Sequence, residues 1–171
     1  MHMNNLKAVV SWAIVVWVCK VFLFSLPYKF TLHPDTQHIF GTIGQWISTT
    51  INDSLGRLFA NFGSYVVGSF ELITSIVLLL PALLWVLHKT GLRVASPSRQ
   101  RFHAIGGLMA SAVMVGAVFF HLFTPLGIEV LHNGQSDGGS LFYAAVSILV
   151  LGDVLFLINL PGLKNKSRLN H

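Results

Sequence analysis

The chain has 171 residues, of which 53% are hydrophobic and only 10% carry a charged side chain. An ordinary soluble domain has about 25% charged residues, so this composition excludes that class of protein. The net charge of +5 does not indicate a nucleic-acid-binding protein, because no element carries a basic face with interleaved aromatic residues. The single cysteine, Cys19, excludes an intramolecular disulfide and a Cys-x-x-Cys redox pair.

Four apolar segments are each long enough to cross a lipid bilayer as a helix. They cover residues 6–26, 64–88, 102–124 and 140–160. About 20 helical residues, rising 1.5 Å each, span a hydrocarbon core of about 30 Å. The sequence therefore predicts a single all-α membrane domain over residues 1–171, a polytopic protein built as a four-transmembrane-helix bundle.

The distribution of basic residues predicts the orientation in the membrane. With four spans, the N-terminus, the connection 89–101 and the tail 161–171 share one side, and the outer loops 27–63 and 125–139 share the other. The first side holds Lys7, Lys89, Arg93, Arg99, Arg101, Lys164, Lys166 and Arg168, whereas the second holds only Lys29 and Arg57. By the positive-inside rule, we expect both termini in the cytoplasm and the protein in a bacterial inner membrane.

The first outer loop contains an amphipathic segment. Pro34, Asp35 and Thr36 predict the start of a helix, with Asp35 or Thr36 as its cap. Apolar residues then recur every four positions, at Ile39, Ile43, Ile47, Ile51, Leu55 and Phe59. This pattern predicts one or two helices along the outer membrane surface. They act as a structural lid over the bundle, as a gate, or as a surface where Ile43 and Ile47 bind a partner.

Ionisable residues within the spans are rare and costly, at roughly 2.5–3.5 kcal/mol for a charge at the centre of a helix. Lys20, Glu71 and His121 come from three different spans and all fall in the outer third of the predicted bundle. Asp153 lies deeper in the fourth span, where we expect it to bond a neighbouring helix or to line a separate cavity.

Glu71 belongs to a small, polar helix face. Ser64, Gly68, Glu71 and Ser75 follow the i, i+4, i+7, i+11 spacing, so this face is predicted to point into the bundle. A buried carboxylate stays ionised only beside a cation, for which Lys20 and His121 are the candidates. Both a structural ion pair and a proton-handling site fit this pattern.

Two further patterns bear on packing and on metal binding. Small residues spaced four apart in the third span, among them Gly107 and Ser111, predict close approach of a neighbouring helix. The outer loops offer His33, His38, Glu129, His132 and Asp137 as nitrogen and oxygen ligands. Their spacing matches no compact metal motif, and we find no haem or flavin motif, so no metal site is predicted.

Three stretches resemble the DoxX-like family of small four-span membrane proteins. They are residues 20–30 (KVFLFSLPYKF), residues 67–73 (VGSFELI), and residues 121–129 with 137–142 (HLFTPLGIE and DGGSLF). Some members of that family look like membrane subunits of quinone-linked oxidoreductases, including thiosulfate-oxidising complexes. By position, the resemblance implies that Lys29, Glu71 and His121 line an outer-leaflet polar pocket together with Lys20.

The leading hypothesis is therefore a membrane-anchor or quinone-interacting subunit of a redox complex. Glu71 or His121 would be the catalytic group that exchanges the quinol proton, and Lys20 or Lys29 would stabilise negative charge on the quinone oxygen. Electrons would come from a protein partner or a bound cofactor. The alternatives are a non-catalytic scaffold or assembly factor, and a small proton-coupled transporter that uses Glu71 and Asp153 and works as a homo-oligomer.

Overall fold

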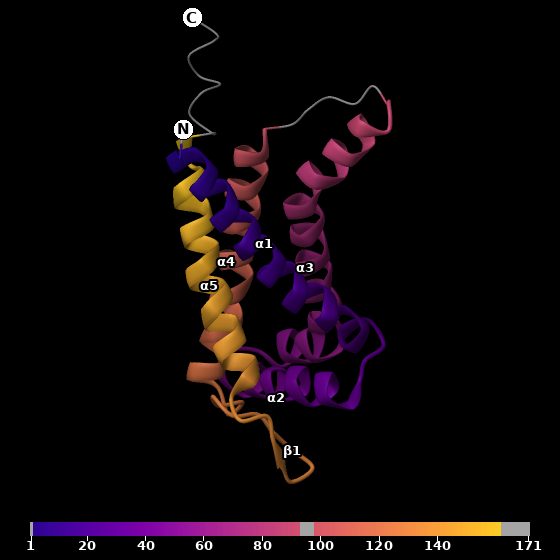
Figure 1. The fold of residues 1–171 in the computed structure, drawn as a ribbon. Helices are drawn as coiled ribbons and strands as arrows, with labels where there is room; N and C mark the ends of the chain where they lie inside the picture. Colours follow the sequence, from indigo (N-terminus) through magenta and orange to yellow (C-terminus); the bar gives the residue numbers. More distant parts are fainter. Residues whose placement is uncertain (1, 93–97, 162–171) are drawn as a thin grey trace, which may run out of the picture.

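The computed structural model describes residues 2–92 and 98–161 (Figure 1). Parts of the predicted connection 89–101 and of the predicted tail 161–171 lie outside the described residues. The elements are α1 (His2–Phe30), α2 (Pro34–Thr50), α3 (Asp53–Lys89), α4 (Arg99–Phe123), β1 (Leu131–His132), β2 (Gln135–Ser136) and α5 (Ser140–Asn159). The helices α1, α3, α4 and α5 are long and apolar enough to cross a membrane, which confirms the predicted all-α polytopic fold.

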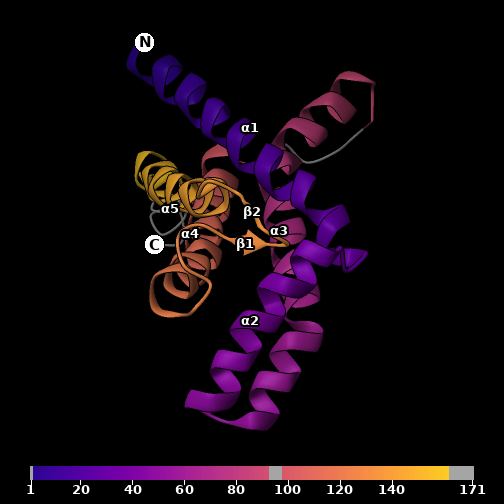
Figure 2. The same ribbon diagram turned by 90° about the horizontal axis from the view of Figure 1, so that it is seen from below.

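The spanning helices form a bundle, and α2 lies at one end of it, against α3. Figure 1 shows α4 and α5 side by side, α1 crossing them obliquely and α3 beyond α1. Seen from below, α2 runs alongside the first turns of α3 (Figure 2). We call this the α2 end of the bundle. The opposite end, where α1 begins and α5 ends, is called the terminal end.

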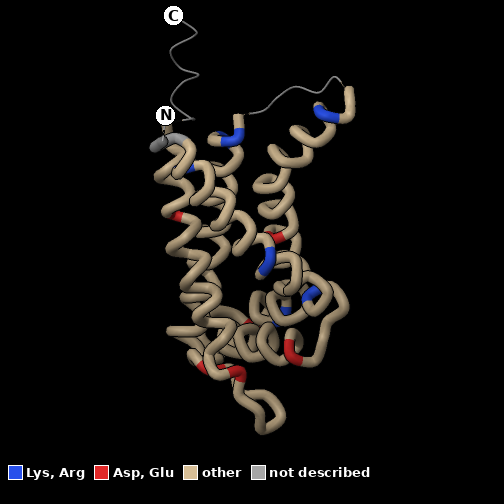
Figure 3. Tube along the Cα trace, viewed as in Figure 1, with Lys and Arg blue, Asp and Glu red and all other residues tan. Residues whose placement is uncertain are grey.

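Burial of apolar side chains follows the contact between the helices. Val15, Phe22, Leu78, Ile148 and Leu155 are all almost completely buried in one cluster formed by α1, α3, α4 and α5. Large apolar side chains on the outward faces remain exposed, as expected for helices surrounded by lipid tails. Charged residues lie mainly toward the two ends, with few along the middle of the bundle (Figure 3).

Helices α4 and α5 approach each other through small residues. A Cβ atom on Gly152 would lie 2.5 Å from Ser111 Oγ and 2.8 Å from the carbonyl oxygen of Gly107. Ser111 Oγ also donates a hydrogen bond to the carbonyl of Leu149 at 3.0 Å. The close approach predicted from the small residues of the third span is thus confirmed.

Polar contacts hold α1, α4 and α5 together near the terminal end. Asn159 Nδ2 donates to Ser11 Oγ at 2.9 Å, and an Arg99 N–H group donates to Asn159 Oδ1 at 3.5 Å. The His103 ring is fully buried and meets the edge of Trp12, with ring centroids 4.6 Å apart. The contacts of Asn159 satisfy polar groups that lipid could not hydrate, whereas His103 Nε2 is buried without a hydrogen-bond partner in the described part of the chain.

The ends of the helices differ from the predicted boundaries. α1 continues through Pro27 to Phe30, because a transmembrane helix tolerates the loss of the one backbone hydrogen bond that proline cannot make. Residues 53–63 are the first turns of α3, capped by the Asn52 side chain, which accepts from Ser54 N and Leu55 N. The second half of the amphipathic segment is therefore continuous with a spanning helix.

The predicted cap of the amphipathic helix is wrong. His33, not Asp35 or Thr36, occupies the N-cap of α2, and its Nδ1 accepts from the backbone N–H of Asp35 at 3.4 Å. Pro34 then takes the first helical position, where its missing N–H costs nothing. Asp35 is thereby placed in the first turn, where its negative charge interacts favourably with the positive end of the helix dipole.

The second outer loop contains a β-hairpin, which was not among the predicted elements. β1 and β2 pair antiparallel, with His132 opposite Gln135. The two residues between the strands, Asn133 and Gly134, have φ angles of 51° and 77°. An Asn-Gly pair is favoured in such two-residue turns because both central residues need positive φ.

The close contact between α4 and α5 can be tested by adding one methyl group. Gly152→Ala forces α4 and α5 apart, and we expect it to destabilise the protein by roughly 1–3 kcal/mol, as overpacking usually does. The measurement is thermal unfolding in detergent, followed by circular dichroism. Gly116→Ala is the matched control, because a Cβ at Gly116 of α4 meets nothing within 4 Å. Equal melting temperatures for the two variants would contradict this packing.

Candidate functional site

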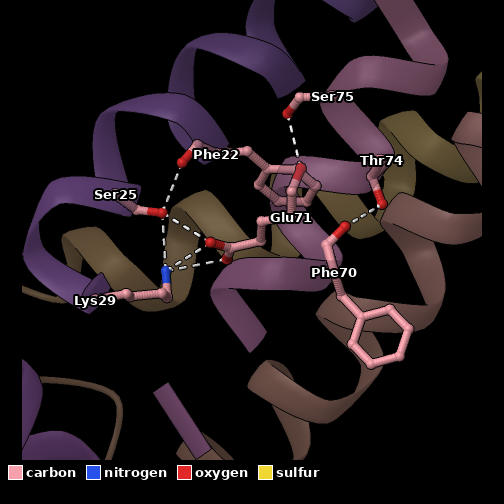
Figure 4. Close-up of polar contacts among 7 residues, drawn as sticks. All are labelled: Phe22, Ser25, Lys29, Phe70, Glu71, Thr74 and Ser75. Atoms are coloured by element: carbon pink, nitrogen blue, oxygen red, sulfur yellow. Dashed lines mark hydrogen bonds and ion pairs between the residues drawn. The ribbon is translucent and has the colours of Figure 1, made fainter. Parts of the chain in front are cut away.

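A buried ion pair joins α1 to α3 (Figure 4). Lys29 Nζ lies 2.8 Å from Glu71 Oε2 and 3.0 Å from Oε1, so the ammonium group contacts both carboxylate oxygens. Only 5% of the Glu71 side chain is exposed, against 16% of the Lys29 side chain. Glu71 is therefore enclosed by protein, while part of the Lys29 side chain remains accessible.

Ser25 completes the hydrogen bonding of this pair. Lys29 Nζ donates to Ser25 Oγ at 2.8 Å, and Ser25 Oγ lies 2.8 Å from Glu71 Oε2 and 2.7 Å from the carbonyl oxygen of Phe22. The single hydroxyl proton serves one of these two acceptors at a time. The three N–H groups of Lys29 match three acceptor atoms, two on Glu71 and one on Ser25.

Local helix geometry explains how the three residues meet. Ser25 and Lys29 are four residues apart and share a face of α1, which exists here because the helix continues past Pro27. On α3, the stripe of Ser64, Gly68, Glu71 and Ser75 is buried, so the predicted inward orientation is confirmed. A Cβ atom at Gly68 would lie 3.4 Å from Lys29 Cβ, so a larger side chain would crowd the lysine.

His121 lies elsewhere and makes different contacts. Its Nδ1 is 2.7 Å from the carbonyl oxygen of Gly127, and its ring meets the edge of Phe142 with centroids 5.7 Å apart. A carbonyl oxygen only accepts, so Nδ1 carries the proton in this bond. The residue ties the end of α4 to the loop that follows it, and the structure shows no contact from its ring to the ion pair.

Lys20 and Asp153 are also separate from the ion pair. Lys20 is exposed on the outward face of α1, with Nζ 5.6 Å from the centroid of the Trp17 ring. Asp153 is exposed on α5. Of the residues predicted to gather near Glu71, the structure brings only Lys29 to it, and Lys29 was a candidate through the family resemblance alone.

The α2 end carries a cluster of histidines around Asp35. His132 Nδ1 lies 2.7 Å from Asp35 Oδ1, His33 Nδ1 lies 3.3 Å from Asp35 Oδ2, and His38 stacks on His132 with ring centroids 4.6 Å apart. The hydrogen bond from His132 holds the pKa of Asp35 below its ordinary value. These contacts attach the β-hairpin to the start of α2.

Within residues 2–92 and 98–161, no three acidic, histidine or cysteine side chains are arranged to hold a metal ion.

Asp137 organises the start of α5. Its carboxylate accepts from the backbone N–H groups of Val130 at 2.7 Å, Gly139 at 3.0 Å and Leu141 at 3.0 Å. Partial burial acts to raise the pKa of Asp137, but these hydrogen bonds and one from Ser140 outweigh it and lower the pKa. Glu129 and Asp137 thus make hydrogen bonds within their own loop, whereas His132 bonds Asp35 of α2; residue spacing alone did not indicate these contacts.

Ile43 and Ile47 of α2 pack inside the protein. Both are buried in a cluster with Leu126 and Val130, which holds α2 against the loop between α4 and α5. The prediction that they form a partner-docking face is therefore wrong, because the apolar face of α2 is already covered by this chain.

The structure also shows an apolar groove on α3. It has a volume of about 310 Å³ and is lined by Tyr65, Val66, Ser69, Phe70 and Ile73. These residues lie on the helix face opposite Glu71, so the groove opens away from the ion pair.

Comparisons of this chain with models of protein families, with curated proteins and with solved structures find no match. The site is therefore interpreted from its own geometry.

The energetic coupling of the ion pair is directly testable. Lys29→Met leaves a buried carboxylate without its cation, so we expect a loss of roughly 3–5 kcal/mol of stability. The double variant Lys29→Met/Glu71→Gln should be more stable than the sum of the single effects predicts, with a coupling energy of roughly 1–3 kcal/mol. Denaturant unfolding of the four proteins of this cycle measures it. Strictly additive effects would show that the two residues do not interact.

The cap formed by Asp137 predicts a pH dependence. Because its pKa is lowered in the folded state, its stabilising effect is present above the ordinary carboxyl pKa and is lost as pH falls through the folded value. We expect Asp137→Asn to cost roughly 1 kcal/mol at pH 7, as loss of a helix cap does, and less as the pH falls below about 4. Thermal unfolding of both proteins between pH 7 and 3 tests this.

The control for this experiment is Asp53→Asn, which removes an exposed pair with Arg57 and should cost no more than about 0.5 kcal/mol. A difference between Asp137→Asn and the parent protein that stays constant down to pH 3 would contradict the assigned role.

Proposed function

We propose that this protein is a quinone-interacting membrane subunit of a redox complex, and that Lys29, Ser25 and Glu71 form its quinone site. The observation that carries the proposal is the asymmetric burial of the ion pair. The Glu71 side chain, of which 5% is exposed, is linked to the Lys29 side chain, of which 16% is exposed, both directly and through a hydroxyl. Such an arrangement can pass a proton between an accessible position and an enclosed base.

The donor set suits a quinone oxygen. A quinone carries out two-electron chemistry coupled to protons at its two oxygens, and the electrons pass to or from a partner in the complex. An oxygen of the quinone that approached the exposed edge of Lys29 would compete with Glu71 Oε1, the longer of the two carboxylate contacts. The ammonium group then stabilises negative charge on that oxygen, while Ser25 keeps its bond to Oε2.

Glu71 is the proton acceptor in this proposal. When a quinol is bound and Lys29 turns toward its oxygen, Glu71 Oε1 loses its contact with the ammonium group and is free to accept the quinol proton. His121 was the alternative candidate for this role. Its Nδ1 is engaged with Gly127, so we assign His121 to positioning the loop after α4.

We further propose that the protein resides in a bacterial inner membrane with both termini in the cytoplasm. Most lysine and arginine residues outside the spans lie in the N-terminus, the connection 89–101 and the tail 161–171, whereas the outer side has Arg57 and, in the last turn of α1, Lys29. The positive-inside rule supports this orientation, which places the ion pair in the outer leaflet.

Mass spectrometry of an organic extract from purified protein tests the function. We expect about one isoprenoid quinone per chain in the parent protein. In Glu71→Gln we expect at least about tenfold less, the change that a loss of about 1.4 kcal/mol in binding produces. Glutamine has nearly the shape of glutamate but no charge, so the substitution changes the chemistry more than the packing.

Glu129→Gln is the matched control, because Glu129 is exposed and bonds only the Ser136 hydroxyl in the described part of the chain. It should retain the quinone. Equal quinone in the parent and Glu71→Gln proteins would place the quinone elsewhere. No enriched quinone in any of the three would contradict the proposed function.

A further inference from the structure

Two charged side chains lie on the outward surface of the spanning helices. Lys20 of α1 and Asp153 of α5 are both exposed. Across residues 2–92 and 98–161, Asp153 has no hydrogen bond and no ion pair. The Lys20 ammonium group lies over the Trp17 ring. Charged groups within a membrane normally face protein or water, because contact with lipid tails is unfavourable.

The surroundings of both residues are apolar. Val16 and Phe24 are exposed near Lys20 on α1, and Val150 and Leu157 are exposed near Asp153 on α5. The two charges therefore lie within surfaces that would otherwise contact lipid, and neither belongs to the polar contacts inside the bundle. A further protein surface is needed to cover them.

Both charges lie near the middle of the membrane. The candidate spans are Asn5–Phe30 and Ser140–Asn159. At 1.5 Å per residue, Lys20 is about 4 Å from the midpoint of its span toward the α2 end, and Asp153 is about 5 Å from the midpoint of its span toward the terminal end. They differ in depth by only about 9 Å by this count.

The side chains also lean toward each other in depth. Side chains tilt toward the N-terminus of their helix, and α1 and α5 run in opposite directions across the bundle. Lys20 accordingly leans toward the terminal end, where its ammonium group lies over Trp17, one turn nearer the N-terminus. It points toward the middle of the span and not toward the nearer end at Phe30, so the lysine is not reaching for the closest aqueous surface.

We infer that this surface binds a second copy of the same chain, with Lys20 of one copy paired to Asp153 of the next. The argument is charge complementarity: each copy carries one cation and one anion at compatible depth, so contact between copies neutralises both without any other protein. The apolar residues around each charge pack against the neighbouring copy. This assembly is independent of the Lys29–Glu71 site, which is complete within one chain.

The test is self-association in liposomes, measured by energy transfer between copies that carry donor or acceptor fluorophores at the C-terminus. We expect Lys20→Asp and Asp153→Lys each to weaken association by at least about tenfold, since each brings like charges together. The decisive result is complementation. Equimolar Lys20→Asp and Asp153→Lys proteins should associate with each other nearly as tightly as the parent protein does, because the mixture restores opposite charges at every contact.

Lys89→Asp is the matched control, since Lys89 lies over Trp85 at 5.8 Å in the same way but at the end of α3; it should associate normally. Should the charge reversals not fold, Lys20→Gln and Asp153→Asn remove each charge at similar size and should also weaken association. A monomeric parent protein, complementation that fails between folded variants, or neutral variants that associate like the parent would overturn the inference and leave a different partner or lipid at this surface.

Discussion

The absence of water in the hydrocarbon core is the constraint on which this structure depends. A polar group there is costly unless it finds a partner, because lipid offers none. Glu71 meets Lys29 and Ser25, Asn159 meets Ser11, and Ser111 reaches the carbonyl of Leu149. Each of these contacts joins two different helices, so the polar groups fix how the apolar helices are arranged. Packing of apolar side chains alone gives little direction in a solvent that is equally apolar.

The ion pair also connects the bundle to its α2 end. Lys29 belongs to the last turn of α1, and the short connection from Phe30 to Pro34 leads directly into α2. Phe30 stacks on Tyr65 of α3, with ring centroids 6.4 Å apart, so the residue after the lysine contacts the same helix as the lysine itself. Lys29 and Phe30 together therefore attach the end of α1 to α3 immediately before the connection to α2.

Sequence periodicity predicted the spans, the close approach of α4 and α5, and the inward face of Glu71, because each is determined by residues along one helix. It did not predict the partner of Glu71. Depth can be counted along a span, but the rotation of each helix about its axis decides which residues meet, and that depends on all the helices together. Lys20 faces outward on α1, and the His121 ring is directed to the loop after α4. Pro27 also suggested an early end to α1, which concealed Lys29 as a helical residue. The hairpin had a local signal, Asn133-Gly134, that was available in the sequence.

The charges within the membrane fall into two groups with different implications. Lys29 and Glu71 neutralise each other inside one chain, so a site built on them needs no second subunit to be stable. Lys20 and Asp153 are exposed on separate helices and can be neutralised only by something outside the chain. If the pair is the place of chemistry and the exposed charges are the place of assembly, the two properties can be altered independently. A monomeric variant would then keep its ligand, and a variant without ligand would still assemble, because no residue is shared between the two groups.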